Sequence, residues 1–546
     1  MWFCSQLSDR VFFVPILFIA LSLVYHPSPH FLTFQDQISP SSSKMILTIS
    51  LLISILPIIL IYLIMPRTTS TKTLIPPGPP GLPLIGNLLQ FRSRTNLHVH
   101  LWQLSNNYGP LMHMKLGPVP VLVVSSAELA KEVLKTQDSA FCSRANHLGL
   151  RKLSYDCANI AFSPYSDYWR EVKKITSVHL LNSKKNQSFR RIREDEVSRM
   201  IKRISAFAES GKVIKFDEMI TSVMSILLCR TAFSKRYDEE GVDIRKFHGL
   251  LQDSQAMMSA FFVSDYFPLL SWIDKVCGSI RRLEKVWKKL DEFYQELINE
   301  HLDPGRAKIN EDQDDILDVL IRLREGSSCS VELSWNSIKA LLMDIFIAGI
   351  DTTAASIVWT MTALMKSPNV MKKLQLEIRE TLGQKNLVDE DELQKLPYLK
   401  AVINESLRLY PPAPLLVPRE TMDKGILKGY EVEPKTIVYV NAWAIARDPE
   451  NWDNPEEFLP ERFLNSDIDV RGHDFRVIPF GSGRRICPGL FMATTSLELI
   501  VANLVYAFDW EFPEGVMPED IDMDALPGLT MCKKEPLCIV PKTYVV

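Results

Sequence analysis

The sequence predicts a mainly α-helical fold with small β-sheets, preceded by an N-terminal membrane anchor. Helical periodicity dominates from about residue 95 onward, two short runs are rich in β-branched residues, and one long apolar run carries no charge. The clearest helical stretches are 126–137, 283–302 and 368–383. The runs VPVLVV and TIVYVNA, the second at 436–442, predict short strands.

The composition excludes several classes of function. The chain has 546 residues, of which 46% are hydrophobic, and its formal net charge of -3 gives no indication of nucleic-acid binding. Its nine cysteines are odd in number and include no C-x-x-C pair, which predicts reduced thiols facing the cytosol rather than a disulfide scaffold. The ten histidines show no zinc-binding spacing.

An uncharged apolar run at 45–65 is predicted to be a transmembrane anchor, because it is about long enough to cross a bilayer as a helix. Arg67 and Lys72 follow it, whereas only Lys44 is basic shortly before it. This excess places the bulk of the chain on the cytosolic side. A buried core helix and a signal peptide are the alternatives, and the latter lacks a small-residue cleavage site.

Two further segments flank the predicted anchor. Residues 1–44 form an N-terminal extension with a short apolar segment at 11–25, which fits a second span, a signal-like segment or an upstream extension. Met45 would make a natural alternative start. Residues 66–84 form a proline-rich hinge, because prolines fix φ and remove hydrogen-bond donors.

A long apolar helix is predicted at about 336–366, enough to cross a whole domain. The sequence AGIDTT (348–353) places polar residues at its midpoint, as is typical of functional sites. Gly349 and the hydroxyl groups can open the helical hydrogen bonding and leave a groove. Asp351 and Thr352 are then candidates to relay protons to oxygen bound there. The alternative is a polar patch that faces a neighbouring helix.

The segment PFGSGRRICPG (479–489) places one cysteine among glycines and arginines. A thiolate is the form that binds metals, and its charge needs stabilisation. Gly481 and Gly483 let backbone N–H groups turn toward the sulfur of Cys487, and the helix predicted after them adds its positive dipole end. Arg485 can pair with a carboxylate. The segment therefore favours a metal-bound thiolate beside an anionic cofactor rim, which heme with its propionates satisfies; an inert cysteine in a turn is the alternative.

This segment also carries a family resemblance. The fixed positions of the pattern F-x-x-G-x-R-x-C-x-G are filled by Phe480, Gly483, Arg485, Cys487 and Gly489. The chain thus resembles the heme-thiolate monooxygenases, the cytochrome P-450 superfamily, over about residues 75–546. The wording CPG and AGIDTT is similar to the plant microsomal type, an A-type plant clan. The tail and the run HGLLQDSQAM resemble the plant family that includes aldoxime-oxidising members.

The resemblance implies a cytochrome P-450 fold over 85–546 with heme b (iron protoporphyrin IX) as its cofactor. Cys487 would be the iron ligand. The other cofactor-binding positions that it implies are Trp169, Lys173, Arg419, Phe480, Gly483, Arg485 and Gly489. The family has an arginine where this chain has Lys173, so the charge is kept but the bidentate fork is lost.

The resemblance also implies a structural charge triad behind the heme pocket. Glu405 and Arg408 stand three residues apart on a predicted helix, and Arg462 lies in the later sequence Pro-Glu-Arg-Phe. The triad's role would be folding and heme retention. The same spacing at Glu196 and Arg199 predicts only a solvated face.

The predicted reaction is a reductive cleavage of O2 that inserts one oxygen atom into a small apolar plant metabolite, with an aldoxime, a phenolic and a terpenoid as the candidate classes. The predicted pocket is lined by small and aliphatic positions. They are Phe346, Ala348, Ala413, Leu415, Leu416, Val417 and Leu529. The aromatic run FFVSDYF (261–267) is expected to form an access lip and a second membrane contact.

The implied partners are O2, membrane lipid and an NADPH-cytochrome P-450 reductase, because the chain has no G-x-G-x-x-G nucleotide motif. A basic run predicts either a docking surface for this acidic reductase or a solvated face. Its members are Lys174, Lys184, Lys185, Arg190, Arg191 and Arg193. The expected location is the endoplasmic reticulum membrane, with the catalytic domain facing the cytosol.

Two other functions stay open. A heme-thiolate dehydratase or isomerase would need no O2, although the intact Asp351 and Thr352 argue against it. A non-catalytic heme-binding sensor or membrane scaffold would need no accessible apolar pocket. The sequence does not specify the substrate.

Overall fold

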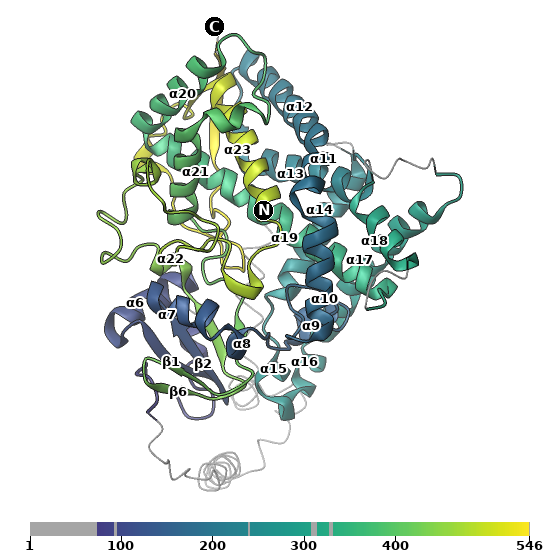
Figure 1. The fold of residues 1–546 in the computed structure, drawn as a ribbon, viewed down its shortest axis with the longest axis vertical. Coiled ribbons are helices and arrows are strands. Elements are labelled where there is room, and N and C mark those ends of the chain that lie inside the picture. Colours follow the sequence, from purple (N-terminus) through teal and green to yellow (C-terminus); the bar gives the residue numbers. More distant parts are fainter. Residues whose placement is uncertain (1–73, 92–95, 238–240, 307–313, 327–330, 545–546) are drawn as a thin grey trace, which may run out of the picture. The chain divides into compact units, whose positions relative to one another are not determined.

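Helix α19 (Trp335–Lys366) is the central helix of the fold (Figure 1). The computed structural model describes residues 74–91, 96–237, 241–306, 314–326 and 331–544. Helix α19 begins where Ser334 accepts a hydrogen bond from the backbone N–H of Ser337, as an N-cap serine does. Helices α13 (Phe216–Phe233), α21 (Pro397–Leu409) and α23 (Leu490–Ala507) pack around it. The predicted long helix is therefore confirmed.

Helices make up most of the described chain. They are α5 (Leu88–Phe91), α6 (Leu97–Tyr108), α7 (Ala127–Lys131), α8 (Asp138–Phe141), α9 (Leu148–Leu153), α10 (Asp167–Ile175), α11 (Ser183–Ser188), α12 (Arg190–Glu209), α13 (Phe216–Phe233), α14 (Val242–Met258), α15 (Val263–Tyr266), α16 (Trp272–Val276), α17 (Ser279–Leu302), α18 (Ile316–Glu325), α20 (Pro368–Leu382), α21 (Pro397–Leu409), α22 (Ala442–Ile445) and α23 (Leu490–Ala507). The stretches predicted at 283–302 and 368–383 are confirmed by α17 and α20. The stretch at 126–137 divides into α7 and one π-helical turn, Glu132–Thr136.

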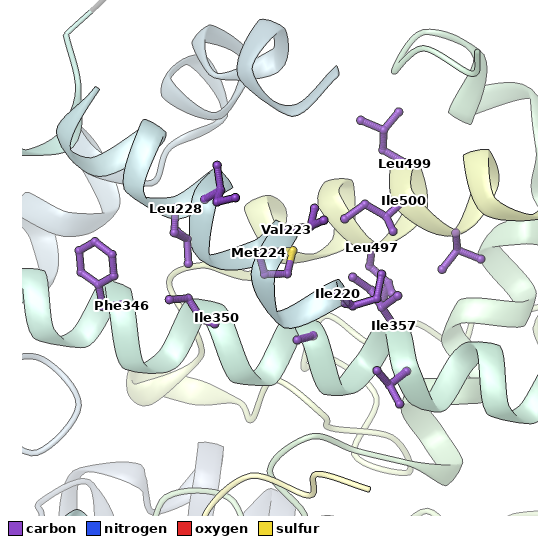
Figure 2. Packing of buried hydrophobic residues seen from close by; sticks show 14 of the residues in the cluster. Ile220, Val223, Met224, Leu228, Phe346, Ile350, Ile357, Leu497, Leu499 and Ile500 are labelled. Atoms are coloured by element: carbon purple, nitrogen blue, oxygen red, sulfur yellow. The ribbon is translucent and has the colours of Figure 1, made fainter. Parts of the chain in front are cut away.

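The core lies where α13, α19 and α23 meet. Figure 2 shows Ile220 and Met224 of α13, Ile350 of α19 and Leu497 and Ile500 of α23 among the buried side chains at this junction. Among the described residues, α19 and α23 are the two single helices that are long and apolar enough to cross a membrane. Their apolar stretches are 61% buried inside the protein, as expected for helices that are hydrophobic on all sides and lie in a core.

The sheets are small, as predicted. Four strands pair in the order β1-β2-β7-β4, namely β1 (Leu111–Leu116), β2 (Val119–Val124), β7 (Ile437–Val440) and β4 (Arg419–Glu420). The two sequence runs predicted to be strands thus lie side by side as the parallel pair β2 and β7. The other strands are β3 (Ile214–Lys215), β8 (Phe508–Glu511) and β9 (Cys538–Thr543) in one sheet, and β5 (Gly425–Leu427) and β6 (Tyr430–Val432) in another.

The predicted N-terminal extension (1–44) and anchor (45–65) lie outside the described residues and stay predictions. The described part of the proline-rich hinge begins at Leu74 and lies along β1, where the backbone N–H of His113 donates to the carbonyl of Pro77 at 2.9 Å. A Cβ atom on Gly78 would stand 1.9 Å from the carbonyl oxygen of His113. Glycine is therefore required for this close approach of the two backbones.

The prediction of a solvated face at Glu196 and Arg199 is wrong for Glu196. Its side chain is 2% exposed and pairs with Arg236 at 2.8 Å and also with Arg230. Arg199 pairs instead with Asp195 at 3.1 Å. The spacing was correct for a helix, but the partners of Glu196 come from α13 and the residues after it, which no local pattern reveals.

Candidate active site

Cys487 lies in the cysteine loop (479–489), immediately before α23. Gly481 and Gly483 adopt φ values of +69° and +70°, the left-handed conformation that glycine tolerates. A Cβ atom on Gly483 would stand 1.9 Å from the carbonyl oxygen of Leu134. The backbone N–H of Cys487 donates to the carbonyl of Phe480 at 3.0 Å and closes the loop. Phe480 and both glycines therefore fix the backbone that presents the sulfur.

The electrostatics at Cys487 suit a sulfur that binds a cation. Burial raises the pKa of its thiol, while the N–H of Gly489 and the ammonium group of Lys173 act in the opposite direction. These two groups stabilise the thiolate, but together they lower the thiol pKa by less than burial raises it. A metal cation bound to the sulfur would supply the remaining stabilisation, because coordination deprotonates a thiol.

Three buried or partly buried guanidinium groups stand beside the cysteine loop. Arg485 donates to the carbonyls of Cys142 (2.8 Å), Ile160 (3.0 Å) and Ser163 (2.7 Å). Burial lowers the pKa of Arg485 to about 10. Arg419 pairs with Asp138 at 2.6 Å and donates to the carbonyl of Ser482. Arg485 belongs to the cysteine loop itself, and Arg419 joins the loop from a segment more than 60 residues earlier.

The third guanidinium belongs to Arg144, which the sequence analysis missed. It donates to the carbonyls of Ala161 (2.9 Å), Val417 (2.6 Å) and Pro418 (2.8 Å). Burial and the charges of Arg485 and Arg419 lower its pKa well below the ordinary value. The three cations are thus close enough to repel one another, although the group is held together by main-chain carbonyls.

The cluster carries more positive than negative charge. Asp138 is the carboxylate that pairs with Arg419 and, at 3.4 Å, with Arg484. Within the described part of the chain, Arg144 and Arg485 form no ion pair. Buried cations without anions are costly, so the arrangement suits an anionic ligand. The two propionates of heme would match the charges of these two arginines.

Gly489 gives a second test of the fit. A Cβ atom there would meet only the Cys487 sulfur, at 3.9 Å, so the space on the sulfur's side of the loop is otherwise open. Cys487 itself is partly exposed rather than packed away. A soft thiolate, an open side and a cationic rim together fit an iron porphyrin. The residues present therefore fit heme.

Trp169 and Lys173 lie on α10 beside this rim, one turn apart. The indole N–H of Trp169 donates to the carbonyl of Ile160 at 3.0 Å, and the guanidinium of Arg485 stacks 4.0 Å from the indole ring. Lys173 donates to the carbonyl of Ile486 at 2.9 Å, and burial lowers the pKa of its ammonium group to about 8. The structure thus brings both residues to the cysteine loop, and their contact with a propionate stays a prediction.

The midpoint of α19 carries the predicted proton-relay residues. Ala348 is exposed although the helix around it is mostly buried. The hydroxyl of Thr352 donates to the carbonyl of Ala348, and α19 continues through these residues without a break. Gly349 lets α13 approach, since a Cβ atom would stand 2.8 Å from the Leu228 side chain. This turn therefore presents a small exposed side chain, Ala348, beside the partly exposed Thr352.

Asp351 is held from another helix. Its carboxylate accepts a hydrogen bond from the side-chain amide of Gln255 on α14. Burial raises the pKa of Asp351, and the Gln255 amide acts in the opposite direction. Gln255 was not predicted from the sequence, because a single glutamine in an ordinary helix gives no signal.

Five of the predicted pocket residues lie in two segments. Ala413, Leu415, Leu416 and Val417 are all partly exposed, and the carbonyl of Val417 is held by Arg144. Leu416 stands 3.9 Å from the position of a Cβ atom on Gly481, so this segment borders the cysteine loop. Leu529 is 45% exposed, in a loop that Trp359 of α19 anchors through the carbonyl of Met531.

Phe346 is placed differently from the other predicted pocket residues. Its ring is fully buried, stacks on Phe233 at 4.8 Å and meets Phe247 edge-on at 5.3 Å. Figure 2 shows it on α19 beside Leu228 of α13. Phe346 is therefore a core residue on the face of α19 that packs against other helices, because position along a helix does not reveal which face meets a cavity.

The predicted triad is brought together. Arg408 binds Glu405 with two hydrogen bonds, at 2.7 and 2.8 Å, and Arg462 approaches the same carboxylate at 3.3 Å. Glu405 and Arg408 are both fully buried. Arg408 also donates to the carbonyls of Ala446, Pro455 and Glu457, so the pair fixes the loops that lead toward the cysteine loop.

Comparisons with known proteins agree with this geometry. The family model for cytochrome P-450 matches residues 76–539. The chain is 49% identical over 476 residues to 6,7,8-trihydroxycoumarin synthase of Pastinaca sativa, covering 86% of this chain and 93% of that one. It is 44% identical over 476 residues to strychnine-11-hydroxylase of Strychnos nux-vomica, covering 87% and 92%.

A solved structure shows the same fold. A zebrafish cytochrome P-450 with progesterone superimposes with a TM-score of 0.70 at 24% identity, covering 82% of this chain and 99% of that one. The predicted fold, mainly helical with small sheets, is thus confirmed for the described residues. With its heme-thiolate motif, its cationic rim and these relatives, the chain belongs to the cytochrome P-450 family and is a monooxygenase.

Proposed function

We propose that the protein is a membrane-anchored hydroxylase of plant secondary metabolism that acts on a flat, oxygenated aromatic compound of the coumarin type. The observation that carries this proposal is the exposed turn at Ala348 and Thr352, inside an otherwise buried helix. Such a turn offers a small apolar surface for the substrate beside a hydroxyl that can move a proton.

Each part of the site has a distinct task. The Cys487 sulfur would hold the iron, and Arg144, Arg419 and Arg485 would bind the propionates. When bound, the heme supplies the reductive activation of O2 and the insertion of one oxygen atom into the substrate. Thr352 would hold and pass a proton on the substrate side, and Asp351 would resupply it from the side of α14.

The substrate class is inferred from the pocket and the relatives. Ala348, Ala413 and Val417 have small side chains, which leave room for a flat ring and offer it few hydrogen bonds. The relatives include enzymes named as synthases of 6,7,8-trihydroxycoumarin and 5-OH-xanthotoxin. Of the three classes predicted from the sequence, these names favour the phenolic over the aldoxime and the terpenoid.

Attachment to the endoplasmic reticulum membrane is part of the proposal. The anchor would be 45–65, with the catalytic domain in the cytosol. In the aromatic run 261–267, Phe262 is 1% exposed and Phe267 lies against Gly117, while the other residues are partly exposed, so its role as an access lip stays a prediction. The exposed apolar side chains follow it, and we assign the second membrane contact to Leu269, Trp272 and Val276, which are 93%, 55% and 76% exposed.

Electrons would come from NADPH through the reductase. The basic run is smaller as a docking surface than the sequence suggested, because Arg193 is fully buried against Glu390 and Lys185 donates to the carbonyl of Asp314. Arg190 pairs with Asp391 at 2.7 Å. Lys174, Lys184 and Arg191 are exposed and stay candidates for contact with an acidic partner.

The test is expression of the full chain with a plant NADPH-cytochrome P-450 reductase in yeast microsomes. Coumarins, an aldoxime and a terpenoid are titrated for a change of heme spin state, and then incubated with NADPH and labelled O2. We expect a hydroxylated coumarin that carries one labelled oxygen and forms only with reductase. Turnover without reductase would instead indicate a dehydratase or isomerase, and a spectral change without any product would indicate a sensor.

A further inference from the structure

Asp344 is an acidic side chain of α19 that the reaction does not use. It stands seven residues before Asp351 in the apolar run LLMDIFIAG. Its carboxylate accepts three hydrogen bonds from one short segment of the loop between α9 and α10. They come from the side-chain amide of Asn159 (2.6 Å) and from the backbone N–H groups of Ile160 (2.7 Å) and Ala161 (3.2 Å).

The opposite side of the same segment faces Arg485 and Trp169, two of the residues predicted to bind heme. The carbonyl of Ile160 accepts a hydrogen bond from Arg485 at 3.0 Å and another from the indole of Trp169 at 3.0 Å. The backbone N–H of Ile160 is thus hydrogen-bonded to Asp344 of α19, and its carbonyl is hydrogen-bonded to Arg485 and Trp169. Two successive hydrogen bonds connect the carboxylate of Asp344 to the guanidinium of Arg485.

The loop that contains this segment is strained. Tyr155, Asp156 and Cys157 are three consecutive residues with positive φ, at 53°, 59° and 61°. Non-glycine residues seldom adopt this conformation, and it persists where surrounding contacts hold them. A strained loop does not fix its own next residues. The three bonds to Asp344 hold the N–H side of 159–161, and the bonds from Arg485, Trp169 and Arg144 hold its carbonyls.

The protonation state of Asp344 decides whether it can accept these hydrogen bonds, and it depends on the charged groups nearby. Lys173 of α10 and Arg485 of the cysteine loop are the cations whose fields interact with it, and the phenols of Tyr168 and Tyr294 face the same carboxylate. Burial raises the pKa of Asp344 to about 6, while the N–H of Ile160 and the amide of Asn159 act in the opposite direction. A protonated carboxyl would turn one acceptor into a donor that faces donors.

We propose that Asp344 is a positioning residue for the heme rim: it fixes residues 159–161 so that the carbonyl of Ile160 holds Arg485 where it meets a propionate. The inference rests on the proposed heme site. In this proposal, the carboxylate of Asp344 couples α19, the helix on the substrate side, to Arg485, which would help to retain the heme.

The experiment exchanges donor and acceptor between two partners. In Asp344→Asn, the new amide meets the Asn159 amide, donor against donor, and in Asn159→Asp two carboxylates meet. In the double variant, the new amide at position 344 donates to the new carboxylate at position 159 and keeps its oxygen for the N–H groups of Ile160 and Ala161. The readout is the rate at which the holoenzyme loses heme to an excess of an apoglobin, followed in the Soret band.

We expect each single variant to lose heme roughly ten-fold faster, as for the loss of a hydrogen bond to a charged group, and the double variant to return to within about three-fold of the wild type. The ratio between Asp344→Asn and the wild type should approach one below about pH 6, because the wild-type carboxyl is then protonated too. Ser337→Ala is the control, since Ser337 lies on α19 and contacts the nearby Tyr168 without touching Ile160.

Wild-type rates of heme loss in both single variants would overturn the inference, as would a ratio independent of pH. If Asp344→Asn does not fold, Asn159→Ala, which removes the bond to Asp344 and the bond from the N–H of Phe162 but no charge, should still lose heme faster than Ser337→Ala. Equal rates would also overturn the inference. The shifted carbonyl Soret band of the wild type tests the proposed site separately. Its absence would reject the heme-thiolate assignment, whereas its presence with unchanged variants rejects only the role of Asp344.

Discussion

The cysteine loop and the midpoint of α19 both carry polar residues in apolar surroundings, but they are specified in different ways. In the loop, the geometry follows from the backbone, since Gly481 and Gly483 have positive φ and the N–H of Cys487 closes on Phe480. In α19 the backbone is a regular helix, and Asp351 depends on Gln255 of α14. A local motif therefore determines the first region, and long-range packing determines the second.

The strongest test of the loop is its sulfur. Cys487→Ala removes the proposed iron ligand, so we expect complete loss of the shifted carbonyl Soret band in the reduced protein. Cys229→Ala is the matched control, because Cys229 is a fully buried thiol in the core, where burial raises its pKa. That variant should keep the band. A band that persisted in Cys487→Ala would show that another residue binds the iron.

The next largest effect tests whether the loop depends on its backbone. Gly483→Ala combines a positive φ with a Cβ atom 1.9 Å from the Leu134 carbonyl, so the loop must move and heme content should fall by most of its value. Gly211→Ala has a similar φ of +60° but nothing within 4 Å, and should cost only about 1 kcal/mol. Heme content and thermal unfolding measure both. Equal losses of heme and of stability in the two variants would mean that the positive φ alone, and not the contact with Leu134, requires glycine.

At the midpoint of α19, Thr352→Ala should act on proton delivery. We expect product per NADPH to fall roughly ten-fold or more, with peroxide in its place, because the hydroxyl is a candidate proton donor. Thr353→Ala is the neighbouring control, since that side chain is 4% exposed and points into the core. Unchanged coupling in Thr352→Ala would remove Thr352 from the relay and weaken the contrast between the two regions.

The smallest effect is expected for Gln255→Leu, which tests the long-range contact. The Gln255 amide lowers the pKa of Asp351 against the effect of burial, so its loss should raise that pKa further. If the relay needs the carboxylate, the acid limb of the pH profile moves to higher pH, and coupling falls by roughly five-fold, as for one lost hydrogen bond. Gln252→Leu changes an exposed glutamine of the same helix and should leave the profile in place.

Several parts of the fold were predictable because short-range physics fixes them. The long helix, α20 and the parallel strands β2 and β7 follow from periodicity and β-branched content. Asp344 could have been found by the same reasoning as Asp351, since both are acids in an apolar helix. Arg144 and Gln255 could not, because their partners are 273 and 96 residues away in sequence.

The errors have the same origin. Phe346 was predicted to line the pocket and Glu196 to face solvent, yet both are buried. In each case the helix was right and the neighbours on its faces were unknown. In the aromatic run 261–267 only Phe262 is buried and the rest is partly exposed, whereas strongly exposed apolar side chains come a few residues later, at Leu269 and Trp272.

By itself, the sequence determined the family, the position of the proposed iron ligand and the helix that carries Asp351 and Thr352, because glycine, cysteine and arginine at fixed spacing leave a loop few conformations. Only the tertiary structure decided that Arg144 lies beside Arg419 and Arg485. It also decided that Gln255 donates to Asp351 and that Asp344 accepts a hydrogen bond from the N–H of Ile160. These contacts join segments far apart in the chain, and their partners are chosen by how the helices pack rather than by any local pattern.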